Sequence, residues 1–552
     1  MLNRFLTALQ QNIIAKGDGL FCSQVGAGGR TDISWARLGQ DIERYAAAYR
    51  EVGVTKGDQV LIFMRHVPDL YGSFFGAMVI GAVPAFMPPS SPKQDPELYW
   101  GSHQKIIEKI SPSVIIFSND LFVEAEAANL CFGSSRILIV EDVGAGACDW
   151  QQVDESHVGL LQHSSGTTGL KKGVALSFRS IADQLEAYSV SLALQPDDSI
   201  VSWLPLYHDM GLIAALMMPT YFGLKVVHID PFLWVRQPDL LFREIERIGG
   251  TLSWTPNFAL EHLALVNGRK AQEYNLNTVR AMINCSEPVK AQTFDRFERA
   301  FVTSGLRREA LQCCYAMAET VFAVTQTAIA VTPARFCADP RSLNRGCIPA
   351  ELAMEAGGEQ LLETGSPIPG VELRFLDEAG EPLSEGVIGE ISVSAPFLFS
   401  GYNKDDERTS QCLQDGWYRT HDIGFMRQGR LYVLGRADDM IIINGRNIYA
   451  HEVESLLGKL EGIKPGRVVV VGQSDPQTGS HALLVLAERA EGSTLADADL
   501  RTAVIRAVFS VFEVTPKRVV LYEAGHLIKT TSGKISRSAN LKRYEERSIG
   551  NG

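Results

Sequence analysis

The residues best suited to chemistry lie in one short loop rich in glycine and hydroxyl groups. Residues 164–169 read Ser-Ser-Gly-Thr-Thr-Gly, and Lys172 and Gly173 follow. Glycines let backbone N–H groups approach an anion closely, while hydroxyls and a lysine add donors and positive charge. The loop is not a Walker sequence, because Gly166 and Gly169 are only three residues apart and Lys172 precedes a glycine. We interpret it as a phosphate cradle of another kind, with a solvated Ser/Gly loop as the plain alternative.

Five further motifs follow along the chain. They are Trp-Leu-Pro-Leu-Tyr-His-Asp at 203–209, Tyr-Ala-Met-Ala-Glu at 315–319, Asp-Gly-Trp-Tyr-Arg-Thr-His-Asp at 415–422, Gly-Arg-Ala-Asp-Asp at 435–439 and Lys-Thr-Thr-Ser-Gly-Lys at 529–534. In order and spacing they resemble the substrate-entry, Tyr-Gly-x-Thr-Glu, ribose-binding, hinge and C-terminal lysine motifs of the adenylate-forming enzymes. That superfamily contains acyl-CoA synthetases, luciferases and the adenylation domains of nonribosomal peptide synthetases.

The resemblance implies a role for each matching residue. Lys534, His208 and Glu319 would be catalytic, with Lys534 bridging the carboxylate and the α-phosphate and His208 at the carboxylate end of the acyl channel. ATP or AMP would be bound by Ser165, Thr167, Thr168, Lys172, Ser286, Tyr315, Asp422 and Arg436. Of these, Asp422 and Arg436 would hold the ribose and Tyr315 would stack on adenine. Glu319 and Thr168 would position Mg²⁺, and Asp438 would be the hinge.

The chemistry of an acyl adenylate explains why such residues are needed. A carboxylate must attack the α-phosphorus of ATP, so two anions approach while negative charge builds on the phosphoryl oxygens. Positioned cations and N–H donors are therefore the main catalytic resource. Taken singly, these residues have structural explanations, such as a helix cap for Glu319 or a core histidine for His208. Only their joint spacing favours catalysis.

Three segments are similar, more narrowly, to the fatty acyl-AMP ligases, which load a carrier protein instead of coenzyme A. These segments are residues 202–212, 284–290 and 441–449. Residues 327–363 are also longer than the matching part of many acyl-CoA synthetases. In the ligases an insertion there restrains the C-terminal domain and disfavours coenzyme A. Three positions depart from the family pattern: Lys171 stands in place of proline, His421 in place of the glycine before the ribose aspartate, and Asp438 at a hinge position that is often lysine in the ligases.

The hydrophobic pattern predicts an α/β fold that can position these motifs. β-branched runs at 60–63, 114–117, 137–140 and 226–229 alternate with helix-length stretches, which indicates parallel sheets covered by helices. After Gly370 the pattern becomes that of an antiparallel β region, with strands at 371–376, 389–394 and 431–434. Helices at 450–460 and 497–512 and strands at 468–472, 482–487 and 519–522 form an α+β end. We predict a large N-terminal domain, 1–434, and a small mobile C-terminal lid domain, 435–552, that carries Lys534.

Composition narrows the class of protein. The 552 residues are 45% hydrophobic and 21% charged, as in soluble globular proteins. With 64 acidic and 52 basic residues the net charge is −12, which disfavours nucleic acid as a partner. Residues 70–92 are uncharged and long enough to span a bilayer, but Gly81 and Pro84 favour a buried helix and strand, so we expect no transmembrane segment. Nine scattered cysteines fit neither a disulfide framework nor a zinc knuckle, and they favour the cytoplasm.

The sequence therefore predicts an acid ligase with two half-reactions. ATP, Mg²⁺ and a carboxylic acid, by resemblance a fatty acid, would give acyl-AMP and pyrophosphate. The acyl group would then pass to the phosphopantetheine of a separate acyl carrier protein. Two alternatives stay open. One is an acyl-CoA synthetase that transfers to coenzyme A. The other is a non-catalytic nucleotide-binding or carrier-docking homologue, which His421 would favour.

Overall fold

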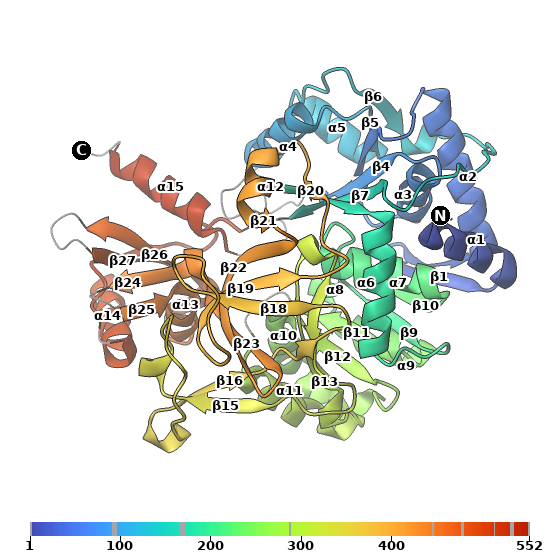
Figure 1. Ribbon diagram of the computed structural model, residues 1–552. Coiled ribbons are helices and arrows are strands. Elements are labelled where there is room, and N and C mark those ends of the chain that lie inside the picture. Colours follow the sequence, from blue (N-terminus) through green and yellow to red (C-terminus); the bar gives the residue numbers. More distant parts are fainter. Residues whose placement is uncertain are drawn as a thin grey trace.

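A computed structural model describes residues 3–90, 96–164, 172–285, 289–443, 446–475, 480–512, 514–529 and 535–549. One large sheet crosses the N-terminal part in the order β17-β14-β13-β12-β11-β9-β10-β1-β2 (Figure 1). Its central strands, from β13 to β1, are parallel, and its outer strands are antiparallel. The strands are β1 Leu20–Gly26, β2 Gly29–Ser34, β9 Ser199–Ser202, β10 Lys225–Ile229, β11 Leu252–Thr255, β12 Ala281–Asn284, β13 Leu311–Ala316, β14 Ala323–Gln326 and β17 Ser366–Pro367.

A second parallel sheet has the order β4-β3-β5-β6. Its strands are β3 Gln59–Phe63, β4 Val83–Met87, β5 Val114–Phe117 and β6 Arg136–Ile139. The strands predicted at 60–63, 114–117, 137–140 and 226–229 are therefore confirmed, with one residue of difference at each end of β6. Such β-branched runs are typical of strands buried on both faces.

The uncharged stretch 70–92 forms a helix and a strand, as predicted. Helix α3, Asp69–Val79, packs on α2, Trp35–Glu51, and β4 follows it. A Cβ atom on Gly72 or Gly76 would lie 2.8 Å from the Cβ atom of Asp41 or of Tyr45. The two glycines are therefore required for close packing of the helices. Within the described residues, no helix is long and apolar enough to cross a membrane.

Other helices cover the sheets, and α6 lies across the larger sheet in the view of Figure 1. Their starts follow local sequence: the side chain of Asn3 caps α1 by accepting from the backbone N–H of Leu6, and Ser177 caps α6 in the same way. The remaining N-terminal helices are α1 Arg4–Lys16, α4 Pro96–Ile110, α5 Asn119–Ala127, α6 Phe178–Ser191, α7 Met218–Phe222, α8 Pro231–Arg236, α9 Leu240–Ile248, α10 Asn257–Asn267 and α11 Ala291–Phe301.

Antiparallel strands connect the parallel sheets to the end of the chain. The predicted antiparallel region is confirmed as the sheet β18-β19-β22-β21, in which β23 also pairs with β22. Three short groups complete this part: β7-β8-β20, the hairpin β15-β16, and the helix α12. The bounds are β7 Val158–Ser164, β8 Lys172–Ser177, β15 Arg335–Ala338, β16 Glu359–Leu362, β18 Glu372–Leu376, β19 Gly389–Ser394, β20 Gly401–Tyr402, α12 Asp406–Cys412, β21 Leu413–Gln414, β22 Trp417–Arg427 and β23 Arg430–Arg436.

The C-terminal residues fold around hydrophobic clusters of their own, which contain residues from Ile441 to Tyr544. Their elements are β24 Met440–Ile443, β25 Arg446–Tyr449, α13 Ala450–Leu457, β26 Ile463–Asp475, β27 Ser480–Arg489, α14 Asp497–Phe512, β28 Arg518–Tyr522 and α15 Arg537–Ile549. The predicted helices and strands are present, although α13 ends three residues earlier, before Gly458. The predicted boundary at 434/435 falls inside β23, and it stays a prediction.

Candidate active site

Lys172 begins β8 directly after the predicted phosphate cradle. Residues 165–171 lie outside the described residues, and with them Ser165, Thr167 and Thr168. Strands β7 and β8 pair antiparallel up to Ser164 and Lys172, the described residues on either side of the predicted cradle. The Nζ atom of Lys172 lies 5.0 Å from the centre of the Tyr402 ring. Burial lowers the pKa of Lys172, and the nearby Glu319 carboxylate opposes that shift.

Glu319 lies buried in a single 3₁₀ turn, η6 Ala318–Thr320, after β13. The hydroxyl of Tyr402 donates to its Oε1 atom at 2.7 Å, and the Tyr418 hydroxyl lies 3.3 Å from that of Tyr402. The next residue but one, Val321, has φ +64°, a conformation that a β-branched side chain rarely adopts and that costs about 1–3 kcal/mol. The surrounding contacts thus hold the Glu319 carboxylate in one position at a strained turn.

Asp422, Arg436 and Tyr315 form a second polar group. Asp422 and Arg436 are register partners on β22 and β23, and the Arg436 Nε donates to the Asp422 Oδ1 at 3.3 Å. The Tyr315 hydroxyl donates to the other carboxylate oxygen at 2.5 Å. Burial raises the pKa of Asp422, and the Arg436 guanidinium opposes this. Tyr315 lies at the carboxyl end of β13, the edge of a parallel sheet where ligands bind in α/β folds.

His421, the departure from the family pattern, occupies a position with φ +59°. A glycine would adopt this left-handed conformation without cost, and histidine is among the other residues that tolerate it. The side chain is 56% exposed, and its Nδ1 lies 3.4 Å from Glu390 Oε1. At this position the adenylate-forming enzymes usually have glycine, which has no side chain. The structure turns that side chain outward, because neighbouring residues of a strand point to opposite faces.

The substrate-entry motif precedes a π-helix, Met210–Met217, which the sequence pattern did not predict. A Cβ atom on Gly211 would lie 2.1 Å from the carbonyl oxygen of Pro205, so only glycine fits where this helix begins. His208 lies just before it, with its ring centre 5.0 Å from that of Tyr207. π-helical turns are frequent at functional sites. Ser286, two residues after β12, lies outside the described residues.

The predicted hinge is linked by an ion pair to Arg537, which lies three residues after Lys534, the predicted catalytic lysine. Lys534 lies outside the described residues, as does the side chain of Asp438, whose backbone belongs to the 3₁₀ turn η9 Ala437–Asp439. Arg537, three residues after Lys534, pairs with Asp439 at 2.6 Å and with Glu454 of α13 at 2.6 Å. Sequence reasoning missed Arg537, because nothing local distinguishes it from other surface arginines.

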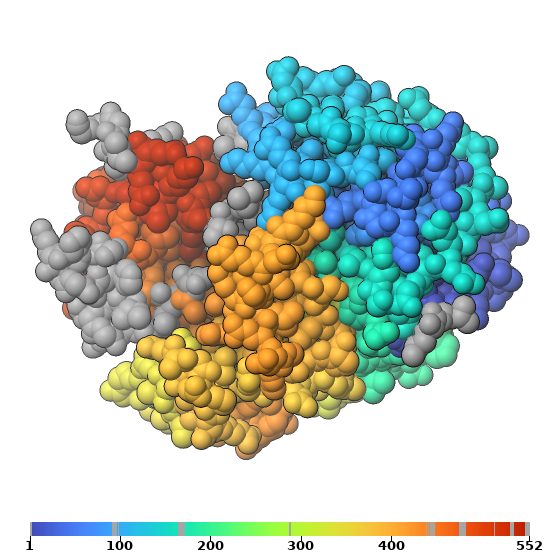
Figure 2. Space-filling model, turned by 45° about the horizontal axis from the view of Figure 1, so that its top comes forward, coloured from blue at the N-terminus to red at the C-terminus, as the bar shows by residue number. Residues whose placement is uncertain are grey.

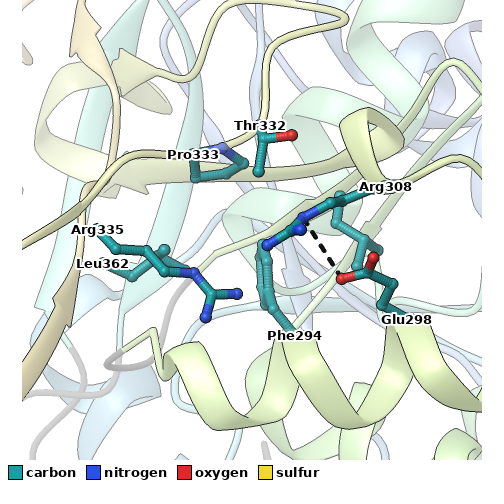
Figure 3. A pocket seen from close by; sticks show the side chains of 8 residues that line it. Phe294, Glu298, Arg308, Thr332, Pro333, Arg335 and Leu362 are labelled. Carbon is teal, nitrogen blue, oxygen red and sulfur yellow. Dashed lines mark ion pairs between the residues drawn. The ribbon is translucent and has the colours of Figure 1, made fainter. Parts of the chain in front are cut away.

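Residues 327–363 touch both parts of the chain. In the N-terminal part, Arg335 of β15 pairs with Asp295 of α11 at 2.5 Å. Figure 3 shows Thr332, Pro333, Arg335 and Leu362 of the segment facing Phe294, Glu298 and Arg308 across a small hollow. On the other side, the carboxyl group of Glu359 in β16 hydrogen-bonds that of Glu452 in α13. The segment thus bridges α11 and the C-terminal part.

The chain is similar in sequence to a known enzyme family and to two named ligases, and similar in fold to a solved structure. The family model of the AMP-binding enzymes matches residues 15–403. A long-chain-fatty-acid–AMP ligase of Mycolicibacterium smegmatis, FadD32, is 30% identical over 94% of this chain and 90% of its own. JamA of Moorena producens, a medium-chain-fatty-acid–[acyl-carrier-protein] ligase, is 27% identical over 89% of this chain and 86% of its own. A structure from a study of fatty acyl-adenylate ligases of E. coli and L. pneumophila superposes with a TM-score of 0.90 at 24% sequence identity. The match covers 99% of this chain and 98% of the chain in that structure.

Proposed function

The chain belongs to the AMP-binding enzyme family, and we propose that it is an acid ligase that converts a fatty acid into acyl-AMP and then loads a carrier protein. The observation that carries this proposal is the grouping of Lys172, Glu319 and the Asp422–Arg436 pair in one electrostatic cluster. Arg436 contributes to the pKa shift of Lys172, and Glu319 to that of Asp422. These residues come from four separate segments, and each is of a chemical type that can bind a nucleotide or its phosphates, which supports the proposal.

In the proposed first step a carboxylate oxygen of the acid bonds to the α-phosphorus of ATP, while the bond from that phosphorus to pyrophosphate breaks. Asp422 accepts hydrogen bonds from the ribose hydroxyls, and Arg436 donates to them. Lys172 and the hydroxyls of the cradle hold the β- and γ-phosphates. Lys534 approaches with the C-terminal part and stabilises charge on the α-phosphoryl oxygens. Loss of one such donor typically lowers the catalytic rate by a factor of about 10²–10³.

Mg²⁺ suits this donor set. Glu319 supplies a buried carboxylate, and within the described residues no group of three or more His, Cys, Asp or Glu could hold a metal ion by itself. Mg²⁺ usually binds through one or two carboxylates together with substrate phosphates. We therefore propose that Glu319, with Thr168, positions Mg²⁺, which would neutralise charge on the phosphates.

In the proposed second step the phosphopantetheine thiol of a separate acyl carrier protein takes the acyl group and releases AMP. The relative JamA bears the name of a ligase for such a carrier. All nine cysteines lie within the described residues and form no disulfide there, which supports a cytoplasmic location. Because the side chain of His421 points outward, this residue no longer favours a non-catalytic homologue.

Pyrophosphate release with fatty acids of increasing length tests the proposal, with acyl-AMP, acyl-CoA and acyl-carrier products detected by mass spectrometry. We expect acyl-AMP that accumulates in the presence of coenzyme A and is consumed by a pantetheinylated carrier. The matched control is Lys534→Ala, which should bind ATP but lose about 10²–10³ in rate. Efficient acyl-CoA synthesis by the wild type would refute the carrier assignment, and absence of acyl-AMP with every acid would refute the ligase.

A further inference from the structure

Helix α12 places an arginine beside the cluster that contains Lys172. Arg408 is half-buried, and its guanidinium carbon lies 5.8 Å from the centre of the Tyr402 ring. The same ring lies 5.0 Å from the Lys172 Nζ and carries the hydroxyl that binds Glu319. Arg408 therefore shares one aromatic contact with the lysine of the cradle. Neither the family resemblance nor the motifs pointed to this residue.

The contacts of α12 fix its position relative to the N-terminal part. Lys109 of α4 pairs with Asp405 at 2.7 Å, just before the helix, and the Lys404 Nζ donates to the carbonyl of Ile110 at 2.6 Å. Figure 1 shows α12 next to α4 and β20. In Figure 2 the orange surface around residue 400 borders the blue and cyan N-terminal surface. Arg408 thus stands on an element that is anchored to the N-terminal part.

Arg408 forms no ion pair among the described residues, and the one carboxylate on which its charge is seen to act, that of Asp405, is already paired with Lys109. Several other half-buried arginines form ion pairs: Arg280 pairs with Asp198, Arg335 with Asp295 and Arg537 with Asp439. A guanidinium keeps its charge at any physiological pH, and partial burial of an unbalanced charge is costly. Its positive charge also acts on Lys172, whose pKa it lowers after the larger effects of burial and Glu319. The Tyr402 ring thus has two cations near it, Lys172 and Arg408, against one carboxylate, that of Glu319, which indicates a site for an anionic ligand.

We propose that Arg408 binds the β- and γ-phosphates of ATP and the pyrophosphate product, as a second cation beside Lys172. This inference rests on the proposed function, because adenylation provides the polyphosphate. In the cluster, Lys172 and Arg436 balance Glu319 and Asp422, so the four described charges cancel and a further cation is needed for a polyphosphate. Arginine is suited to the task, since its planar fork can hold two phosphate oxygens at once.

The test is ATP–pyrophosphate exchange, together with calorimetric titration of pyrophosphate and of AMP, on wild type, Arg408→Ala and Arg408→Lys. For Arg408→Ala we expect pyrophosphate to bind about tenfold more weakly, with a matching rise in the KM for pyrophosphate. AMP affinity should change by less than about twofold, because AMP has no β- or γ-phosphate. Arg408→Lys should lie between the two, since it keeps the charge and loses the fork.

The matched control is Arg374→Ala. Arg374 also stacks on an aromatic ring, with its guanidinium carbon 4.2 Å from the centre of the Trp417 ring, but it does not contribute to the pKa of Lys172. Its loss should leave pyrophosphate affinity unchanged. An unchanged pyrophosphate affinity in Arg408→Ala, or an equal loss of AMP and pyrophosphate binding, would overturn the inference. A wild type that binds pyrophosphate but shows no exchange would count against the proposed function and leave the role of Arg408 intact.

Discussion

At the residue scale, the site depends on carboxylates whose partners come from distant parts of the chain. Asp422 receives one hydrogen bond from Tyr315, 107 residues away, and one from Arg436, which lies opposite it on the next strand. Both donors fix the carboxylate before any nucleotide arrives. Such preorganisation reduces the cost of ordering the group when a ligand binds.

Asp422→Ala should therefore weaken nucleotide binding more than it weakens the fold. Hydrogen bonds to a charged acceptor contribute about 1.5–3 kcal/mol, which corresponds to a rise of about tenfold or more in the KM for ATP. Steady-state kinetics with varied ATP measures this, and Asp422→Asn serves as the control that keeps the shape. An unchanged KM for ATP would place the ribose site elsewhere.

His421 should be replaceable by glycine but not by a β-branched residue. His421→Gly keeps the φ of +59° and loses only an exposed contact with Glu390, so we expect the free energy of unfolding to change by less than about 1 kcal/mol. His421→Val should cost about 1–3 kcal/mol. Urea denaturation of both variants measures the difference. Equal stability of the two would show that the backbone here does not need a left-handed conformation.

At the element scale, the hairpin β15-β16 meets α13 through two carboxyl groups. Burial raises the pKa of Glu452, and the charge of Glu359 raises it further, while Lys290 opposes the shift. Burial also raises the pKa of Glu359. Tyr449, which lies beside both carboxyls and near Arg345, is the other titratable group at this contact. The arrangement fits a protonated Glu452 that donates to Glu359.

The contact between β16 and α13 should consequently weaken as pH rises. Both carboxyls bind protons more tightly when docked than at their ordinary pKa of 4.5. Docking is therefore fully favoured below that pKa and is lost as pH rises through the raised value. Glu452→Gln keeps a permanent donor, so hydrogen exchange in β16 and α13 should become less dependent on pH between about pH 5 and about pH 9.

The exposed Glu461, just after α13, provides a matched control. Glu461→Gln should exchange like the wild type at every pH, because its charge is solvated in both arrangements. If Glu452→Gln and Glu461→Gln gave the same pH profile as the wild type, the carboxyl pair would have no part in docking.

At the scale of the whole molecule, the C-terminal part has its own hydrophobic clusters, and among the described residues it meets the N-terminal part through a few contacts, one of them between Lys290 and Ser455. Tyr449 packs with Phe336, Phe425 and Tyr432, and the Glu359–Glu452 contact adds a polar link. Interfaces of this limited kind permit relative motion of domains. The proposed second half-reaction requires such motion, and residues 327–363 lie where they can restrain it.

Shortening residues 328–362 to a brief Gly/Ser turn should raise acyl-CoA formation without improving adenylation. Strands β14 and β17 flank the segment, and their residues Gln326 and Ser366 are register partners, so the ends can be rejoined. The shortened segment would favour only the domain arrangement that transfers the acyl group, and not the arrangement that forms acyl-AMP. Mass detection of acyl-CoA checks this, and Phe336→Ala, which removes one interface contact, is a milder companion variant. Unchanged acyl-CoA formation in both would remove this segment from the choice of acceptor.

The sequence alone determined what depends on local chemistry and local periodicity. The cradle, the alternation of strands and helices, the antiparallel region and the interrupted stretch 70–92 are each coded within a few residues, because backbone preference and hydrophobic period act over that range. Lys172 was indicated by the residue types of the cradle, whereas Glu319, Asp422 and Arg436 were assigned by resemblance to the adenylate-forming enzymes. Their grouping in one cluster was an expectation of the resemblance.

Only the tertiary structure decided which side chains complete the site. The Tyr402 hydroxyl donates to Glu319, which is 83 residues away in sequence. The guanidinium of Arg408 lies near the same Tyr402 ring. Arg537, three residues after Lys534, pairs with Asp439 of the predicted hinge turn. The harmless orientation of His421 likewise depends on its φ and on the pairing of β22 with β19. Contacts between residues far apart in sequence arise from how the sheets pack, and no local pattern in a single sequence carries that information.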